Sequence, residues 1–329
     1  MDISIVIPCY NSEKNIETVI ADLKNVFSSI KLKFEFILVN DCSKDHTFYV
    51  ISELARKNKN ITAINLAKNS GQHAAMMAGF HYVRGDVVVT CEDDGQTNID
   101  VFPKMYKKLS DGYDVATVNM TDRGHRSFFR KAGSKVTEIM NHTLVDSNHN
   151  KPVFIIFMAK KFVIDELIKY DQPFPYINGL VSRTTSNIAW VDSTQKDRHS
   201  GHSGYNFRKL LNLWLNGFTA FSIRPLRWSV ILGGISSIIG FVMAVILIIR
   251  KLVLMDDVGA GWTSIIAVIL IMSGIVLAVL GMIGEYIGRI YLCINHTPQY
   301  VVRDIINSDR TNGALSQTSN DISCGDSSV

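Results

Sequence analysis

The sequence predicts an α/β protein in which a domain with a mostly parallel sheet precedes interfacial helices and a two-helix transmembrane hairpin. Short apolar, β-branched runs alternate with helix-like segments over residues 3–119. Such alternation, with continuously apolar strands, is typical of a parallel sheet covered by helices on both faces. Two long runs without a charged residue follow near the C-terminus and predict the hairpin.

The expected strands are ISIVIP (3–8), FEFILVN (34–40), ITAINL (61–66), DVVVT (86–90) and DVATVN (114–119). Helical spacing of apolar residues predicts helices at 12–27, 45–57, 71–83 and 100–109, with Ser12 as the cap of the first. Further helices are expected at 128–143 and 160–169. The polar stretches PCYN, NDCSKD and CEDDGQ each follow a strand, so they should converge on the edge where such sheets bind ligands.

The uncharged runs at 228–249 and 258–284 are long enough to cross a membrane. As helices they would reach about 33 and 40 Å, against a bilayer core of about 30 Å. We expect spans at 228–249 and 262–284, with buried soluble helices as the alternative. Arg224, Arg227 and Arg289 flank the outer ends of the pair. The positive-inside rule therefore places the first domain and both termini in the cytoplasm, as an integral protein of the cytoplasmic membrane.

These spans set the remaining domain boundaries. Residues 1–206 form the cytoplasmic domain, and 207–227 form an amphipathic segment that lies in the membrane interface or packs on that domain. Residues 285–307 are a cytoplasmic juxtamembrane segment. Residues 308–329 are polar, and we expect this tail to be disordered. Hairpins and interfacial helices often pack against their own copies, so a homo-oligomer is compatible with this plan.

Composition excludes several classes of protein. The net charge is only +4, and no basic run is interleaved with aromatic residues, which argues against a nucleic-acid partner. The five cysteines are scattered and include no CxxC pair. This pattern argues against a disulfide framework and against a zinc site.

Three consecutive carboxylates, Glu92, Asp93 and Asp94, follow the DVVVT run. Side chains spaced i and i+2 at a strand end can point to one side, which pairs Glu92 with Asp94. Such a pair can hold Mg²⁺ or Mn²⁺, which would offset the repulsion between the carboxylates and bridge to phosphate oxygens. The cation would also act as a Lewis acid for a departing diphosphate. A solvated acidic turn is the alternative.

These motifs together resemble a known family. VIPCYNSEKNI, VNDCSKDHT, NSGQHAAMMAGF and CEDDGQTN occur in the order and spacing of the family 2 glycosyltransferases with the GT-A fold. RHSGHSGYNFRKL, FTAFSIRPLR and GEYIGRIY resemble the membrane branch that glycosylates polyprenyl phosphates. That branch includes dolichol-phosphate mannose synthase and bacterial bactoprenol glucosyltransferases. The resemblance extends over about residues 3–303.

The resemblance implies an inverting, metal-dependent transferase that moves a sugar from a UDP- or GDP-linked donor to polyprenyl phosphate, in cell-envelope glycan modification. It implies a nucleotide pocket lined by Pro8, Tyr10, Asn11, Asp41, Glu92 and Gln96, with Glu92 and Asp94 on the metal. It implies catalytic roles for Asp93, Asp94 and Arg198. It places the acceptor phosphate near Arg198, Gly201, Ser203 and Tyr205, and Lys209 is close enough in sequence to assist.

The chain also departs from the family pattern. Ser12 replaces the usual glutamate, Asn40 and Cys42 replace Asp and Gly of the DDGS turn, and Glu92 replaces the first metal aspartate. The family's acidic and FR residues before the helix at 160 are absent from the sequence. Two alternatives therefore stay open: a transferase with a lipid-linked or glycan hydroxyl as acceptor, and a non-catalytic, membrane-anchored nucleotide-sugar binder.

Overall fold

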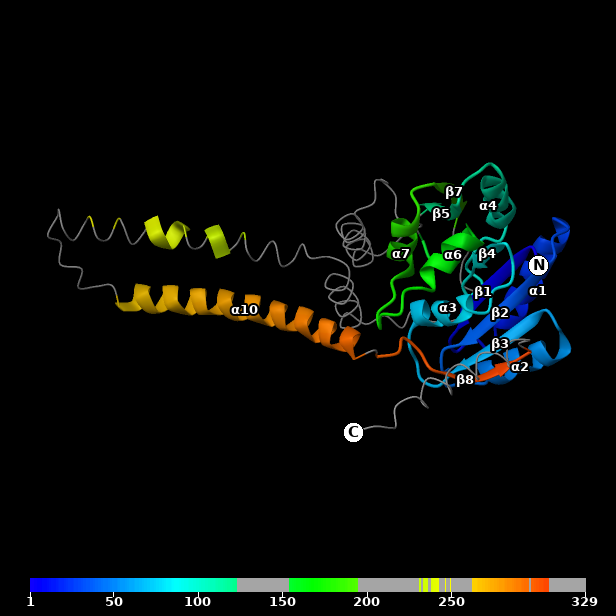
Figure 1. The fold of residues 1–329 in the computed structure, drawn as a ribbon, viewed down its shortest axis with the longest axis horizontal. Coiled ribbons are helices and arrows are strands. Elements are labelled where there is room, and N and C mark those ends of the chain that lie inside the picture. Colours follow the sequence, from blue (N-terminus) through cyan, green and yellow to red (C-terminus); the bar gives the residue numbers. More distant parts are fainter. Residues whose placement is uncertain are drawn as a thin grey trace, which may run out of the picture. The chain divides into compact units, whose positions relative to one another are not determined.

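A computed structural model describes residues 1–122, 154–194, 262–295 and 297–307, and residues 231, 233–235, 238–242, 246 and 249. The described residues fall into two compact units. One unit contains an α/β sheet domain, which residues 297–307 rejoin near the C-terminus (Figure 1). The other contains the apolar helices that lie between residues 231 and 295.

The sheet has eight strands in the order β7-β5-β6-β4-β1-β2-β3-β8. Their bounds are β1 Ile3–Cys9, β2 Phe34–Asn40, β3 Ile61–Leu66, β4 Val87–Thr90, β5 Val115–Asp122, β6 Phe157–Lys160, β7 Ile188–Thr194 and β8 Val302–Ile306. Strands β1 to β4 pair in parallel, and β5 pairs in parallel with β7. Strands β6 and β8 run antiparallel to their neighbours, so the sheet is mixed.

Helices cover both faces of this sheet. They are α1 Ile16–Ser29, α2 Thr47–Lys57, α3 Gln72–Phe80, α4 Val101–Ser110, α6 Lys161–Leu167 and α7 Ile177–Thr184. Apolar residues of α1, α2 and α4 pack into the core cluster on one face, and those of α3, α6 and α7 pack into the cluster on the other. The predicted, mostly parallel α/β sheet is therefore confirmed, and the strands that lead to the polar loops are buried on both faces.

Some local predictions differ from the structure. Strands β6, β7 and β8 and helix α7 were not expected, and the predicted helix at 128–143 lies outside the described residues. Ser12 does not cap the first helix, because α1 begins at Ile16 with Asn15 at the cap position. The backbone carbonyl of Ser12 accepts the N–H groups of Asn15 and Ile16 in a preceding turn. Its hydroxyl makes a different contact, described below.

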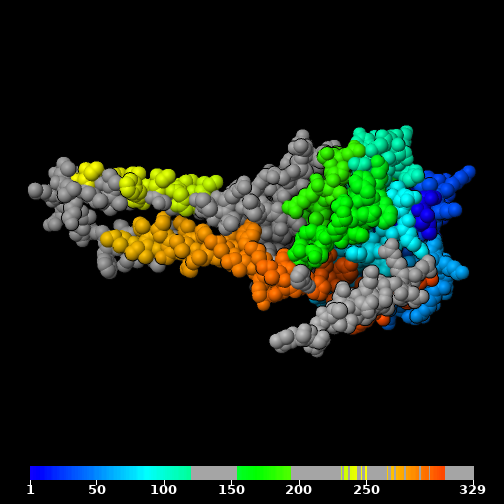
Figure 2. Space-filling model, viewed as in Figure 1, coloured from blue at the N-terminus to red at the C-terminus, as the bar shows by residue number. Residues whose placement is uncertain are grey.

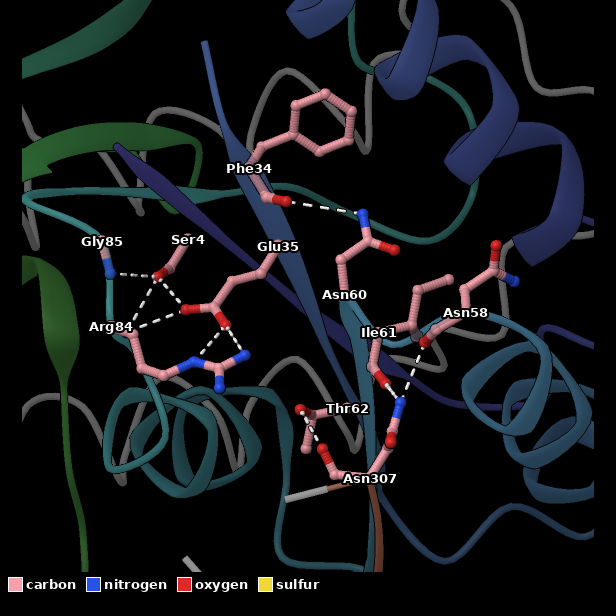
Figure 3. A network of polar contacts seen from close by, with 10 residues as sticks. All are labelled: Ser4, Phe34, Glu35, Asn58, Asn60, Ile61, Thr62, Arg84, Gly85 and Asn307. Carbon is pink, nitrogen blue, oxygen red and sulfur yellow. Dashed lines mark hydrogen bonds and ion pairs between the residues drawn. The ribbon is translucent and has the colours of Figure 1, made fainter. Parts of the chain in front are cut away.

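At the end of the sheet opposite the polar loops, Glu35 and Arg84 form an ion pair (Figure 3). Glu35, whose side chain is 1% exposed, accepts hydrogen bonds from Ser4 Oγ at 2.6 Å and from Arg84 Nε at 2.7 Å. The backbone N–H of Gly85 donates to Ser4 Oγ at 2.8 Å. A Cβ at Gly85 would lie 2.6 Å from the backbone of Ile3, so only glycine permits this approach.

The second unit contains one helix long and apolar enough to span a membrane among the described residues. Helix α10, Trp262–Ile294, includes the candidate span Met272–Ile294. The described apolar side chains of this helix are mostly exposed, as expected for a helix solvated by lipid, and the helix is drawn in orange in Figure 2. It continues beyond the predicted end at Gly284. Described residues between 231 and 249 are helical, and the two-helix hairpin stays a prediction.

Candidate active site

Polar loops leave the carboxyl ends of β1, β2, β3 and β4, four adjacent strands of the sheet. Three of these loops are the PCYN, NDCSKD and CEDDGQ stretches. Hydrogen bonds between the loops bring them together, as predicted from the strand order. Parallel α/β sheets bind ligands at this edge because the loops there can diverge around a cleft while the strands below stay fixed.

Asp93 joins the loop after β4 to the loop after β1. Its Oδ2 accepts the backbone N–H of Tyr10 at 2.9 Å and also the hydroxyl of Ser12. Burial raises the pKa of Asp93, the hydrogen bonds from Ser12 and Tyr10 oppose that shift, and the nearby charge of Asp94 adds to it. Because Asp93 Oδ2 accepts both of these hydrogen bonds, Asp93 holds the turn at Tyr10–Ser12.

Asn11 joins the loop after β1 to the loop after β2. Its backbone N–H donates to Ser43 Oγ at 3.0 Å, and its side-chain Oδ1 accepts the N–H of Lys44 at 3.0 Å. Asn11 and Cys42 have φ values of 55° and 52°. Non-glycine residues rarely adopt this left-handed conformation, and such strain is concentrated at functional sites, where surrounding contacts hold it in place.

Asp41 anchors the loop that precedes α3. Its carboxylate accepts the N–H of Ser70 at 2.7 Å and of Gly71 at 2.9 Å, and its carbonyl accepts Asn69 Nδ2 at 3.1 Å. The residue is only 4% exposed. Desolvation raises its pKa, while the two backbone N–H groups oppose that shift. Asp41 thus holds the loop before α3 in place beside the predicted nucleotide pocket.

Glu92, Asp94 and Gln96 lie on the loop after β4, and all three are partly exposed. Asp94 Oδ1 accepts the N–H of Gln96 at 3.0 Å, which holds the loop in a tight turn with Gly95 at φ 73°. Glu92 and Asp94 therefore stand at the ligand-binding edge of the sheet with solvent access.

The donor set at this loop fits a divalent cation shared with a ligand. No group of three His, Cys, Asp or Glu side chains that could hold a metal occurs among the described residues. A cation enclosed by protein ligands alone is thus not indicated there. Mg²⁺ and similar hard cations, however, are commonly bound by one or two carboxylates with water and substrate phosphates, which Glu92 and Asp94 can provide.

Two thiols lie beneath these loops and take no part in nucleophilic chemistry. Cys9 and Cys91 are buried, with 0% and 2% exposure. Burial raises the pKa of Cys9 well above its ordinary value and that of Cys91 to about 12. A thiol that stays protonated at neutral pH is a poor nucleophile and metal ligand.

The structure thus brings together most of the predicted donor-side residues. Pro8 is buried at the end of β1, and Tyr10 is 45% exposed beside it. The predicted acceptor residues Arg198, Gly201, Ser203, Tyr205 and Lys209 lie outside the described residues. Sequence reasoning missed Ser12 and Ser43 as contacts between the loops. Their position within two or three residues of a strand end was the available signal.

The family model described as glycosyl transferase family 2 matches residues 4–169, just over half of the chain. The matched segment contains every loop described above. The chain belongs to this family. It is accordingly a glycosyltransferase with a GT-A-like fold, as the resemblance of its motifs predicted.

Relatives of this glycosyltransferase match it over nearly its whole length. An undecaprenyl-phosphate 4-deoxy-4-formamido-L-arabinose transferase of Photorhabdus laumondii is 29% identical over 94% of this chain and 96% of its own. A glycosyltransferase of Bacillus subtilis, YkcC, whose activity is uncharacterised, is 32% identical over 91% and 93%. The crystal structure of mannosyl-3-phosphoglycerate synthase from Rubrobacter xylanophilus is 15% identical over 69% and 74%, with a TM-score of 0.47.

Proposed function

We propose that this glycosyltransferase moves a sugar from a nucleoside-diphosphate sugar to polyprenyl phosphate at the cytoplasmic face of the membrane, with inversion at the anomeric carbon. The observation that carries the proposal is the convergence of the loops after β1, β2 and β4 beside two partly exposed carboxylates, Glu92 and Asp94. The full-length similarity to undecaprenyl-phosphate sugar transferases supports the choice of acceptor.

The donor would lie across the strand ends. The turn at Tyr10–Ser12 is held by Asp93 and Ser43, and the loop before α3 is held by Asp41. These contacts fix backbone and side-chain positions before any ligand arrives. Such pre-organisation lowers the entropic cost of binding and orients the sugar for attack.

Glu92 and Asp94 would hold a Mg²⁺ or Mn²⁺ ion together with the diphosphate. When bound, that ion neutralises charge on the leaving diphosphate and so acts as a Lewis acid. Asp93 takes a different part, since its Oδ2 accepts hydrogen bonds from Tyr10 and Ser12. We assign it to positioning the pocket, where it contributes to catalysis by orienting the loop that faces the donor.

A lipid phosphate acceptor requires no general base, because its oxygen is already largely ionised near pH 7. Catalysis then depends on positioning the two substrates and stabilising the leaving group. The apolar, surface-exposed helix α10 supports this choice, since it would keep the domain beside the bilayer from which a polyprenyl phosphate emerges. Arg198 and Lys209 are the proposed phosphate contacts, because guanidinium and ammonium groups are suited to phosphate.

The product identifies the acceptor. Membranes that contain the protein, supplied with Mn²⁺ and a panel of labelled UDP- and GDP-sugars, should form an organic-extractable lipid that mild acid hydrolyses. A product that survives mild acid would instead indicate a hydroxyl acceptor. Binding of a nucleoside diphosphate without turnover of any donor would indicate a non-catalytic binder. Either of these results would contradict the proposed reaction.

A further inference from the structure

A row of polar side chains crosses the sheet just below the candidate active site. Cys9, Asn40, Asn65 and Asp304 are register partners across β1, β2, β3 and β8. Asn40 is 3% exposed and Asn65 is 9% exposed, whereas Asp304 lies at the exposed edge strand. Burying an amide lowers the stability of the fold unless the amide is hydrogen-bonded, so these side chains should have hydrogen-bond partners.

Asn40, Asn65 and Asp304 form a continuous hydrogen-bonded chain that ends at the loop after β1. Asn65 Nδ2 donates to Asp304 Oδ2 at 2.9 Å, and Asn40 Nδ2 donates to Asn65 Oδ1 at 2.8 Å. Asn40 Oδ1 then accepts Ser43 Oγ at 2.5 Å. Ser43 Oγ in turn accepts the backbone N–H of Asn11 at 3.0 Å.

The two ends of this chain fix its direction. An ionised carboxylate only accepts hydrogen bonds, so Asp304 requires Asn65 to present its NH₂ group. At the other end the backbone N–H of Ser43, which only donates, points to Asn40 Oδ1 at 3.3 Å. If either amide were reversed, two acceptors or two donors would face each other within the sheet. Asp304 and Ser43 therefore specify a single orientation of both buried amides.

Strand β8 is held firmly enough to act as one end of the chain. Asn307, just after β8, donates from Nδ2 to the carbonyls of Ala55, Asn58 and Ile61 at 2.9, 2.9 and 3.1 Å. Its own carbonyl accepts Thr62 Oγ1 at 3.2 Å, and Figure 3 shows the contacts of Asn307 with Asn58, Ile61 and Thr62. The strand that follows the apolar helix α10 is thereby fixed against β3.

We propose that Asp304 is a positioning residue for the donor nucleotide. Through Asn65 and Asn40 it orients Ser43, which holds the turn at Asn11. The proposal builds on the proposed donor site. Asn40 stands where the family pattern has aspartate, and in this chain the acceptor-only member of the row is Asp304 on β8.

Moving the carboxylate of the row from position 304 to position 40 tests this proposal. In Asn40→Asp, the new carboxylate requires the NH₂ of Asn65, which turns Asn65 Oδ1 toward Asp304. We expect nucleoside diphosphate affinity to fall about tenfold, the cost of one poorly satisfied buried polar group. In the double variant Asn40→Asp/Asp304→Asn, the amide introduced on β8 can donate to Asn65 Oδ1 and Asn65 Nδ2 can donate to the new carboxylate, while Ser43 still donates to residue 40. Affinity should return to within about threefold of the wild type, by the same conversion.

The measurements are calorimetry with UDP and GDP in the presence of Mn²⁺, and hydrogen exchange of residues 10–13 and 43–45 without nucleotide, on the full chain in lipid nanodiscs. Exchange should rise in Asn40→Asp and fall back in the double variant. Asn60→Asp is the matched control, because Asn60 contacts Phe34 O at the other end of these strands. It should leave both measurements unchanged.

Two results would overturn the proposal: a double variant no better than Asn40→Asp, or an Asn40→Asp protein equal to the wild type in affinity and exchange. If the wild type bound neither nucleotide, the proposed donor site would fail, and the exchange pattern alone would then decide whether Asp304 orients the turn.

Discussion

At the scale of single residues, three adjacent carboxylates have separate environments. All three are partly exposed, but Asp93 accepts hydrogen bonds from Tyr10 and Ser12, whereas Asp94 accepts one from Gln96 within its own loop. The environment of a carboxylate decides its role more than its position in a motif does. In the proposed mechanism Asp93 therefore positions the pocket, and Asp94 is the residue on which metal-dependent catalysis should depend most.

Asp94→Ala should lower turnover by about a hundredfold or more, because it removes one of two carboxylates proposed for the cation that stabilises the leaving diphosphate. The melting temperature should change little, since Asp94 is partly exposed and its hydrogen bond from the Gln96 N–H lies within the same loop. Asp100→Ala is the control: Asp100 is exposed and makes no side-chain bond to cap α4. Equal turnover in the two variants would remove Asp94 from the mechanism.

His73 makes the stability of the domain depend on pH. Its Nδ1 is buried without a hydrogen-bond partner among the described residues, and its ring packs edge-on against Tyr176. Burial lowers its pKa from 6.5 to about 4. Between these values the unfolded chain binds a proton that the folded chain does not, so stability falls as pH decreases from 6.5 to 4. The loss amounts to about 3 kcal/mol for this group.

Melting temperatures at pH 7 and pH 4.5 test this contribution. The wild type should lose more stability over that interval than His73→Leu, because leucine has no proton to bind. A parallel decline of the two proteins would show that His73 is not the group responsible.

At the scale of elements, β8 closes the sheet after the chain has passed through helix α10. Its end is secured by Asn307, which has a φ of 66° and three bonds from one amide group. Asn307→Gly loses those bonds but keeps the left-handed backbone at no steric cost, whereas Asn307→Ala loses the bonds and adds strain of about 1 kcal/mol. Hydrogen exchange of β8 should therefore rise in both variants, and most in Asn307→Ala. The reverse order would contradict this role of the backbone conformation.

The sequence predicted the elements whose signal is local. Strands β1 to β4 are continuous apolar runs, and their order along the chain placed the polar loops at one edge. Strand β8 has Arg303 and Asp304 at its centre and pairs with residues more than 230 positions away, so no local pattern indicates it. Ser12 matched a helix cap by type. Its hydroxyl instead bonds Asp93, a partner 81 residues later that only the folded chain brings near.

The candidate site could likewise be predicted only where its signal is local. The family resemblance implied that Asp41 and Asn11 would line one pocket, and their positions after strands predicted that they would lie at one edge of the sheet. They did not predict that Asp41 would cap the loop at Ser70 and Gly71, or that Asn40 would depend on Asn65 and Asp304. Those contacts join segments that are distant in sequence, and the number of possible pairings among polar residues leaves them undetermined without the fold.

At the scale of the whole molecule, the proposed function combines a nucleotide site at the sheet edge with a helix apolar enough to span a membrane. The described part of the chain has one helix able to span a membrane, with its apolar side chains exposed. The proposed lipid acceptor would explain why a transferase of this family carries such a helix. A phosphate on that lipid would allow transfer without a general base.

The most direct test uses vesicles of defined composition that contain the purified full chain, a labelled sugar donor accepted in membranes, and Mn²⁺. One set contains undecaprenyl phosphate and the other contains undecaprenol. We predict a glycosylated lipid only with the phosphate, linked through a phosphodiester that mild acid cleaves. Equal product from undecaprenol, or none from either lipid with a donor that the protein turns over, would contradict the central claim.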